Sequence, residues 1–435
     1  MKKNLYAILL LSAFTLASCG KSEAPAESSK PETTAASSTA ASTSAAAAEK
    51  TSPVTTATEP APISDLPDGA VLKPLETVEV YEDMPLSKLI NEKNVELRDP
   101  DMLADTSETG AKSVKVAFTY EGVLYETEVK YIVEDTTPPL KLNGGWNPYV
   151  RVGEAFDVDN IIGYADNYDR HPQAVYSGEV DTSEVGSYPI SVTVSDSSGN
   201  ETSWDMTVLV VNEIPKPEDN NDRVDFADFM DYYDFYDDVS FGIDVSVWQS
   251  DVDFEAVRDA GCEFVLMRMG YYYGSDVVMD DYYKQNMANA TAAGLDVGVY
   301  FYTADNTEEG ARERARWIVE QLDGRKLDYP IAFDWEEWAT FQEYGMNLHD
   351  LNSVFEAFAD EVGKSGYSAM LYSSKNFLET VWKNYGDHPV WLAHYTDETD
   401  YEGDFALWQA SAYGRIPGIG GDVDMNIRFN YEPLD

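Results

Sequence analysis

Two acidic residues spaced by one position follow an apolar run late in the chain. They are Asp334 and Glu336, in the segment FDWE at 333–336. If this segment is a β-strand, alternation places both carboxylates on one face, with Phe333 and Trp335 on the other. Carboxylates held close together in a partly dry cleft repel each other, and their pKa values separate. One would keep its proton near neutral pH while the other stays anionic, which is the division of labour that cleavage of a glycosidic bond needs.

Two further acids lie in apolar runs of the same region. Asp244 stands in GIDVS at 242–246, and Asp424 stands in DVDMN at 422–426. In a chain this acidic, a D-x-E triplet alone is weak evidence, but four acids at three strand ends favour a catalytic mouth. Aromatic residues near other strand ends suit the faces of sugars, although each could equally be a core residue: Tyr300, Tyr302, Tyr372, Trp391, Tyr395 and Trp408.

Predicted strands and helices alternate around these acids. Apolar runs predict strands at 241–246, 262–270, 295–303, 329–336, 367–373, 389–396, 405–410 and 422–429. Helical patterns, each closely followed by a glycine, lie at 253–260, 280–293, 307–322 and 347–365. Such alternation predicts parallel strands with right-handed crossovers, and eight of them predict a barrel whose chemistry sits at the C-terminal strand ends. The last connections are too short for full helices, so we expect an irregular α/β (TIM-like) barrel over 240–435.

Upstream of the barrel, one pattern occurs twice. DTSETG at 105–110 returns as DTSEVG at 181–186, and each copy precedes two alternating stretches joined by a turn, at 121–122 and at 198–200. Period-two alternation indicates half-buried strands. We therefore predict two all-β sandwiches, 66–135 and 136–212, which resemble the immunoglobulin-like repeats of bacterial surface proteins.

Sandwich repeats of this kind are usually spacers. The alternative is weak binding of wall polymer, or of Ca²⁺ through Asp166, Asp169 and Asp196. Residues 213–239 follow as an acidic linker, in which an aspartate recurs every three residues between aromatic residues. We expect these aromatic side chains to pack on the next domain.

The first residues have the composition of a targeting signal. Two lysines precede a short apolar stretch, too short for the ~20 residues that span a bilayer. The following LASC at 16–19 resembles the lipobox of bacterial lipoproteins, which implies a signal peptide over 1–18 and lipid on Cys19. Residues 19–65, rich in Ser, Thr, Ala, Pro and Glu, predict a disordered tether.

Charge and cysteine content exclude several classes of protein. The 435 residues include 30 Lys and Arg against 79 Asp and Glu, a formal net charge of −49. Sequence-independent binding of nucleic acid depends on basic residues and is excluded. Two cysteines cannot form a disulfide framework. The four histidines show no ligand-like pairing, so we expect no metal and no cofactor.

The barrel region resembles glycoside hydrolase family 25, the N-acetylmuramidases or Chalaropsis-type lysozymes. The resemblance covers about 240–430, nearly the whole predicted domain. It rests on GIDVS at 242–246, YFY at 300–302, D-x-E at 334–336, WLAHY at 391–395, LWQ at 407–409 and VDMN at 423–426. An acidic domain departs from the basic lysozymes that are drawn to an anionic wall, which concerns affinity and not chemistry.

The resemblance implies a role for each matched position. Glu336 would be the general acid that protonates the leaving oxygen of the β-1,4 bond between N-acetylmuramic acid and N-acetylglucosamine. Asp334 would stabilise the charge that develops on the sugar, or orient its N-acetyl group. Asp244 and Asp424 would tune the acid and bind substrate. The aromatic residues that would shape the subsites are Tyr302, Trp391, Tyr395, Trp408 and Tyr372.

These expectations describe a monomeric, membrane-anchored peptidoglycan hydrolase outside the cytoplasm, facing the cell wall. Its partners would be glycan strands and, through the lipid on Cys19, the membrane. One alternative is a non-catalytic wall-binding lipoprotein that uses the barrel as a lectin, and the four intact acids argue against it. Another is the substrate-binding lipoprotein of a transporter, which the barrel pattern and the two spacer repeats disfavour.

Overall fold

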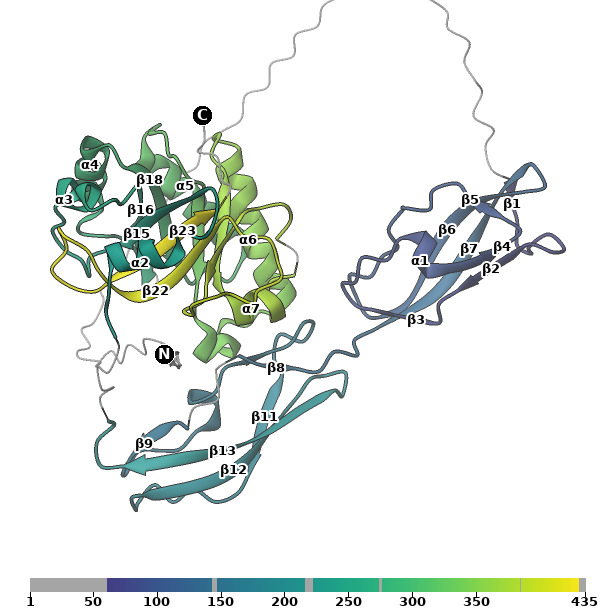
Figure 1. The fold of residues 1–435 in the computed structure, drawn as a ribbon. Helices are drawn as coiled ribbons and strands as arrows, with labels where there is room; N and C mark the ends of the chain where they lie inside the picture. The colour runs from purple at the N-terminus through teal and green to yellow at the C-terminus, as the bar shows by residue number, and fades with distance from the viewer. Residues whose placement is uncertain (1–60, 143–146, 216–221, 274–275, 384, 430–435) are drawn as a thin grey trace, which may run out of the picture.

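The computed structural model describes residues 61–142, 147–215, 222–273, 276–383 and 385–429. The predicted signal peptide, Cys19 and nearly all of the predicted tether lie outside the described residues. Three parts follow one another along the described chain, two β-rich units and a larger α/β domain (Figure 1). No helix in these described ranges is long and apolar enough to cross a membrane.

The two N-terminal units contain short strands around one long hairpin each. The elements of the first unit are β1 (Ala61–Pro62), β2 (Val71–Pro74), β3 (Thr77–Glu79), α1 (Leu86–Leu89), β4 (Ile90–Lys93), β5 (Glu96–Leu97), β6 (Gly110–Tyr120) and β7 (Val123–Glu134). Those of the second are β8 (Leu140–Lys141), β9 (Tyr149–Arg151), η1 (Val158–Asn160), β10 (Tyr164–Ala165), β11 (Gln173–Ser177), β12 (Gly186–Ser195) and β13 (Glu201–Val211).

Both units use the same sheet plan. In the first, β5 pairs antiparallel with β6, and β3 pairs parallel with β7. In the second, β11 pairs antiparallel with β12, and β9 pairs parallel with β13. Each unit buries a separate apolar cluster, and the long hairpins supply much of it because alternate side chains point to one face.

The repeated sequence motif forms the same local turn in both units. The carboxylate of Asp105 accepts hydrogen bonds from the backbone and hydroxyl of Ser107, and Asp181 binds Ser183 in the same way. The predicted turn of the first hairpin is confirmed: Glu121 and Gly122 have φ values of 49° and 79°. Two successive positive φ values are typical of the tight turn that joins antiparallel strands.

The C-terminal domain alternates strands and helices through most of its length. Its elements are β14 (Val224–Asp225), α2 (Phe226–Tyr233), β15 (Val239–Val245), α3 (Phe254–Asp259), β16 (Phe264–Tyr273), β17 (Asp276–Met279), α4 (Tyr283–Ala293), β18 (Asp296–Thr303), α5 (Glu308–Leu322), β19 (Ile331–Trp335), η2 (Trp338–Tyr344), α6 (Leu348–Gly363), β20 (Ala369–Ser374), α7 (Lys375–Thr380), β21 (Val390–Ala393), β22 (Leu407–Arg415) and β23 (Val423–Phe429).

The principal strands of this domain close into a ring. Parallel neighbours run in the order β15, β16, β18, β19, β20, β21 and β22, and β23 lies antiparallel between β22 and β15. One apolar cluster fills the inside of the ring, and a larger one lies between the strands and the surrounding helices. Because β23 runs in the opposite direction, its first residues lie at the rim where the parallel strands end.

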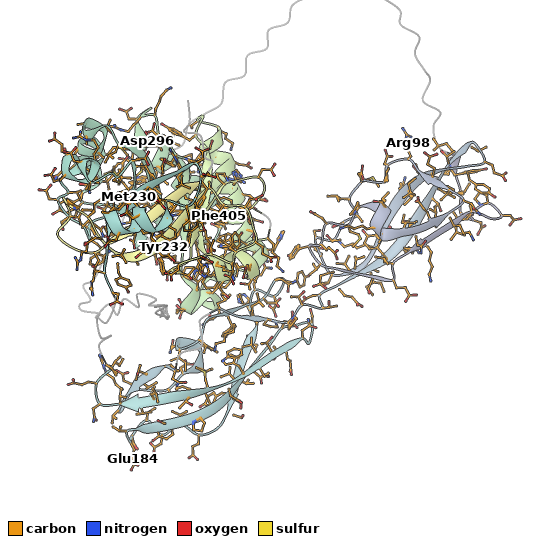
Figure 2. The ribbon with its side chains drawn as sticks, in the orientation of Figure 1. Arg98, Glu184, Met230, Tyr232, Asp296 and Phe405 are labelled. Atoms are coloured by element: carbon orange, nitrogen blue, oxygen red, sulfur yellow. The ribbon has the colours of Figure 1, made fainter. Side chains whose placement is uncertain are left out.

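Part of the predicted acidic linker belongs to this domain. β14 pairs with β22, and α2 buries Phe226, Phe229 and Tyr233 in the outer core, while its aspartates and Tyr232 are exposed (Figure 2). The burial of Phe226 and Phe229 agrees with the predicted packing of the aromatic residues, whereas Tyr232 and Phe235 remain 50% and 57% exposed. The predicted end of the linker at 239 differs from the structure, in which the domain already begins at β14. The aspartate repeat drew attention away from the amphipathic pattern that forms α2.

The second unit contacts the C-terminal domain beside η2. The side-chain amide of Gln342 donates to the carbonyl oxygen of Ile162 over 3.0 Å. An added Cβ at Gly163 would lie 1.8 Å from the carbonyl oxygen of Trp338, so only glycine permits this approach. Ala165 is part of the same buried cluster as the outer core of the barrel.

Candidate active site

Strand β19 positions the D-x-E pair by simple alternation. Phe333 packs on Phe355 and Phe358 of α6, on the helix side of the strand, as predicted. Asp334 points the other way and is 4% exposed. Glu336 follows directly after the strand, where its side chain is open to solvent. The pair therefore stands at the C-terminal rim of the ring.

Asp244 is held by a network of amides inside the same rim. Its Oδ2 accepts hydrogen bonds from Gln409 Nε2 and Asn426 Nδ2, both over 2.8 Å. Strand pairing sets Asp424 directly opposite Asp244, and the two carboxyl groups hydrogen-bond to each other. A carboxylate with several amide donors is fixed in position, which favours its anionic form.

One indole N–H and two tyrosine hydroxyls fix these amides in turn. The indole N–H of Trp391 donates to Asn426 Oδ1 over 2.8 Å. The Tyr372 and Tyr395 hydroxyls donate to Gln409 Oε1 over 2.9 and 2.8 Å. With their oxygens occupied in this way, both amides must present N–H groups to Asp244.

Burial raises the pKa of every carboxyl group in the cluster. The pKa of Asp244 rises to about 6, with the hydrogen bonds from Asn426 and Gln409 opposing the shift. The pKa values of Asp334 and Asp424 rise well above the ordinary range, with repulsion from Glu336 and from Asp244 respectively as the next cause. Such a cluster retains protons near neutral pH.

Glu336 has the environment of an acid that titrates near neutrality. Surrounding protein atoms raise its pKa to about 7, and the charges of Glu337 and Asp244 add to the shift. Its side chain is nonetheless exposed to solvent, so water screens these charges and limits the shift.

Asp334 carries an unsatisfied acceptor. Its Oδ1 is buried and accepts no hydrogen bond from any described residue. Arg268 lowers the pKa of Asp334 through its charge, but its guanidinium pairs with Asp280 over 2.8 Å. A buried acceptor without a partner costs free energy, so this atom is suited to a donor that arrives with a ligand.

The predicted aromatic residues divide into three groups. Tyr302, whose hydroxyl donates to Glu337 Oε1 over 2.9 Å, and Tyr395, 36% exposed, lie at the accessible rim. Tyr372 and Trp391 are buried inside the ring and act through the amides that they hold.

Trp408 does not agree with its predicted role as a sugar-binding residue. It is fully buried, packs edge-on against Tyr233 of α2 and donates its indole N–H to the His394 carbonyl. On β22, Leu407 and Gln409 point into the ring, so alternation turns Trp408 outward.

Sequence reasoning missed several residues of the site. Gln409 and Asn426 were named only as parts of matched motifs, although both donate to Asp244 and Gln409 also accepts both tyrosine hydroxyls. The same-face rule on β22 and β23 could have found both. Trp248, 65% exposed in the loop after β15, is an aromatic residue beside the rim, and its signal is its position three residues past the strand.

Two family models match the chain. Residues 243–419 match glycosyl hydrolases family 25, and residues 140–210 match the Ig-like domain of bacterial surface proteins. The first match includes Asp244, Asp334 and Glu336 but ends before β23, which carries Asp424. The second match spans most of the second N-terminal unit. Immunoglobulin-like character of that unit and a multidomain chain, both predicted, are confirmed.

Curated relatives match the C-terminal domain. The chain is 30% identical over 193 residues to the uncharacterized protein YegX of Escherichia coli K12, across 43% of this chain and 68% of that protein. It is 28% identical over 204 residues to lysozyme M1 of Streptomyces globisporus, across 43% and 67% of the two chains. The autolytic lysozyme of Clostridium acetobutylicum is 28% identical over 189 residues, across 42% and 54%.

Two bacterial proteins are among the solved structures that align with part of this chain. The lysozyme from Streptomyces coelicolor aligns with a TM-score of 0.37 and 23% identity, over 44% of this chain and 93% of that one. The modular autolysin LytC from Streptococcus pneumoniae aligns with a TM-score of 0.41 and 21% identity, over 55% and 56% of the two chains.

Proposed function

This chain belongs to glycosyl hydrolase family 25 and is a glycoside hydrolase, and we propose that it cleaves the β-1,4 bond between N-acetylmuramic acid and N-acetylglucosamine in peptidoglycan. The observation that carries the proposal is the convergence of Asp244, Asp334, Glu336 and Asp424 at one rim, with every pKa raised by burial. The relatives named lysozymes support the choice of substrate.

Glu336 is the general acid of this proposal. It opens to solvent at the mouth, and its pKa near 7 lets it hold a proton at neutral pH and release it to the leaving glycosidic oxygen. Asp244 is held in place by two amides, and its pKa of about 6 is lower than that of Glu336. It therefore holds negative charge near the reacting sugar. Asp424 shares a proton with Asp244 and keeps the cluster from carrying its full charge.

Asp334 binds the substrate through its free oxygen. We assign Oδ1 as the acceptor for the N–H of the sugar's acetamide group, because this buried atom has no partner among the described residues. Such a bond orients the acetamide toward the anomeric carbon and strengthens as positive charge develops on the sugar. Tyr302, Tyr395 and Trp248 supply aromatic surface at the rim.

The bond that is cleaved is tested by the ends that are formed. Purified peptidoglycan is digested with the full-length protein, and the products are reduced and identified by mass spectrometry. New reducing ends of N-acetylmuramic acid are expected. Reducing ends of N-acetylglucosamine would reject the assigned bond, and binding without new ends on several wall types would reject peptidoglycan cleavage.

The proposed acid makes the pH profile sensitive to Glu337. Activity should fall as pH rises through the pKa of Glu336, because the acid then loses its proton. Glu337→Gln removes a charge that raises this pKa, while its amide oxygen can still accept the Tyr302 hydroxyl. We expect the alkaline limb of kcat/KM to move down by about 0.5–1 in pH. If Glu337→Gln keeps wild-type activity and the alkaline limb of its pH profile does not move, the assignment of that limb to Glu336 would be contradicted.

Membrane anchoring is part of the proposal and rests on the lipobox-like LASC at 16–19. Lipid on Cys19 would hold the enzyme beside its substrate, and high local concentration would replace the electrostatic attraction that an acidic protein lacks. Cys19→Ser should move the protein from the membrane fraction to the soluble fraction of cells. Equal membrane association of both forms would reject the anchor.

A further inference from the structure

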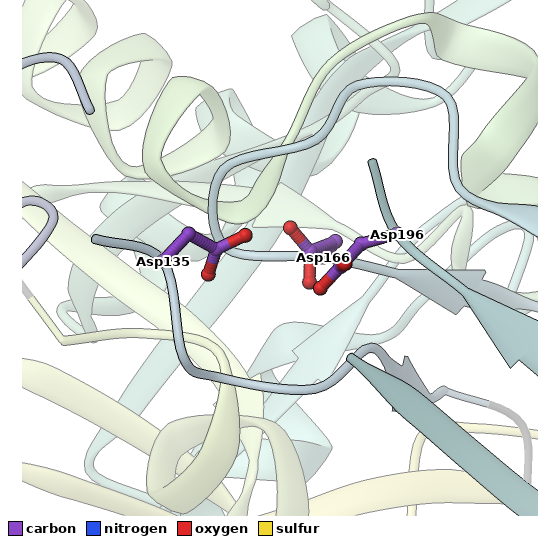
Figure 3. Close-up of side chains that lie close together, drawn as sticks. All are labelled: Asp135, Asp166 and Asp196. Atoms are coloured by element: carbon purple, nitrogen blue, oxygen red, sulfur yellow. The ribbon is translucent and has the colours of Figure 1, made fainter. Parts of the chain in front are cut away.

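Three carboxylates meet where the two N-terminal units and the C-terminal domain adjoin. Asp135 follows β7 at the end of the first unit, Asp166 follows β10, and Asp196 follows β12 at the hairpin turn. They lie far apart in sequence, yet one oxygen of each lies within 4.8 Å of the other two (Figure 3). Only the tertiary structure brings them together.

The cluster has acceptors in excess of donors. Asp135 and Asp166 are 6% and 1% exposed. Neither Oδ of Asp135, nor Oδ2 of Asp166, nor the buried Oδ1 of the adjacent Asn167 accepts a hydrogen bond of ordinary geometry from the described residues. Within those residues, no lysine, arginine or histidine is recorded in an ion pair with the three aspartates. Three buried carboxylate oxygens of one cluster, none with a hydrogen bond of ordinary geometry from the described residues, indicate a missing positive charge.

Electrostatics agree with this geometry. Burial raises the pKa of Asp135, with Asp196 adding to the shift and Ser198 offsetting part of it. Burial also raises the pKa of Asp166 to about 6, with repulsion from Asp135 and Asp196 adding to it. Bringing three carboxylates together is costly unless a cation compensates them.

The local hydrogen bonds hold the remaining oxygens in fixed positions. Asp166 Oδ1 accepts the backbone N–H groups of Tyr168 and Asp169 over 2.9 and 2.6 Å. Asn200 donates from its backbone and its side chain to the two oxygens of Asp196, both over 2.8 Å, and also donates to the Asp135 carbonyl. The loops therefore preorganise the site before any ion arrives.

We propose that Asp135, Asp166 and Asp196 bind a Ca²⁺ ion at this junction. Donors that are all oxygen, with no histidine or cysteine, select a hard cation. Ca²⁺ takes 6–8 oxygen ligands at about 2.3–2.6 Å in irregular geometry, and water would complete the set. Mg²⁺ demands a tighter octahedron and fits a set of protein oxygens from three separate loops less well.

The ion would stabilise the contact between the second unit and the catalytic domain. The loop that begins at Asp166 docks on the start of α6: the Asp166 carbonyl accepts the Leu348 N–H over 2.9 Å, and Asn347 Nδ2 donates to the Tyr168 carbonyl over 2.7 Å. Arg170 forms a two-pronged ion pair with Asp350 on the same turn. The first unit joins in through Tyr81, which stacks on His349 with ring centroids 3.7 Å apart.

The docked helix follows the catalytic rim along the chain. Only η2 lies between Glu336 and α6, and Gln342 of η2 is itself bonded to the second unit. The site is independent of the proposed cleavage chemistry, so its test can fail while the hydrolase assignment stands.

Calcium binding is tested on the full chain after treatment with a chelator. Titration with CaCl₂ should give one saturable site and a rise of several degrees in Tm, and MgCl₂ should raise Tm less. Asp166→Asn keeps the shape of the side chain and should weaken binding at least tenfold. Asp196→Asn, in a separate loop, should do the same, which protects the test if one variant folds poorly. Asp181→Asn, an exposed acid of the same unit, is the matched control and should bind as the wild type does.

Trypsin reports on the docked loop. Cleavage after Arg170 should slow when Ca²⁺ is added to the wild type and stay unchanged in Asp166→Asn. The proposal would be overturned by a wild-type Tm that does not respond to Ca²⁺, by an equal response to Mg²⁺, or by unchanged affinity in both Asp166→Asn and Asp196→Asn.

Discussion

Glu336→Gln should lower the rate of peptidoglycan cleavage by about 10²–10⁴-fold, the usual contribution of a general acid. Glutamine has the same shape but cannot donate a proton to the leaving oxygen. Glu336 is open to solvent, so its replacement leaves no hole in the core. Tm should therefore stay within about 2 °C of the wild-type value, since surface changes have small effects on stability.

The experiment compares release of reducing ends by the full-length wild type and variant at pH 6. Glu343→Gln is the matched control, because Glu343 is an exposed acid of η2 close to Glu336 along the chain. The control should keep wild-type activity. More than a tenth of wild-type turnover in Glu336→Gln, with Tm unchanged, would remove Glu336 from the role of acid.

Asp334→Asn should have two opposite effects, loss of activity and gain of stability. The amide cannot lose a proton and become negatively charged as positive charge develops on the sugar, and we expect about 10²–10³-fold lower kcat. Because burial raises the pKa of Asp334 above its ordinary value of 3.8, its contribution to stability is complete below that pH and is lost as pH rises toward the folded-state pKa. The variant carries no such group and escapes the loss.

Thermal unfolding at two pH values separates these effects. At pH 7 the variant should melt about 2–4 °C above the wild type, which for a domain of this size is about 1 kcal/mol. At pH 4 the difference should shrink. Asp360→Asn, which changes an exposed acid of α6, should shift Tm at neither pH. A variant less stable than wild type at pH 7 would mean that the Asp334 carboxylate is compensated by a partner in the folded protein.

Local pattern was sufficient for the strands and the D-x-E pair. The predicted strand at 329–336 overlaps β19, and alternation alone placed Phe333 and Trp335 against the helices and Asp334 inside the ring. The helices predicted at 307–322 and 347–365 differ from α5 and α6 by one or two residues at their ends. These features depend on neighbours along the chain, whose spacing is visible in the sequence.

Contacts between distant segments needed the tertiary structure. Asp424 reaches Asp244 because β23 runs antiparallel to its neighbours, whereas regular alternation had predicted parallel strands. Trp408 points outward because its neighbours Leu407 and Gln409 point into the ring. Helix α2 forms where its aromatic residues can pack on the outside of the barrel. Register between strands is a property of the closed ring and not of any one strand.

The sequence by itself determined which residue types can do the chemistry, the family they resemble and the order of domains along the chain. It did not determine that Asp135 joins Asp166 and Asp196, or that Asp169, predicted to bind Ca²⁺ with them, instead accepts backbone N–H groups of His171 and Ser197. The physical reason is the same for this cluster and for the cluster of acids in the candidate active site. Carboxylates repel and gain nothing from one another locally, so their meeting is imposed by the packing of strands and loops that lie far apart in the chain.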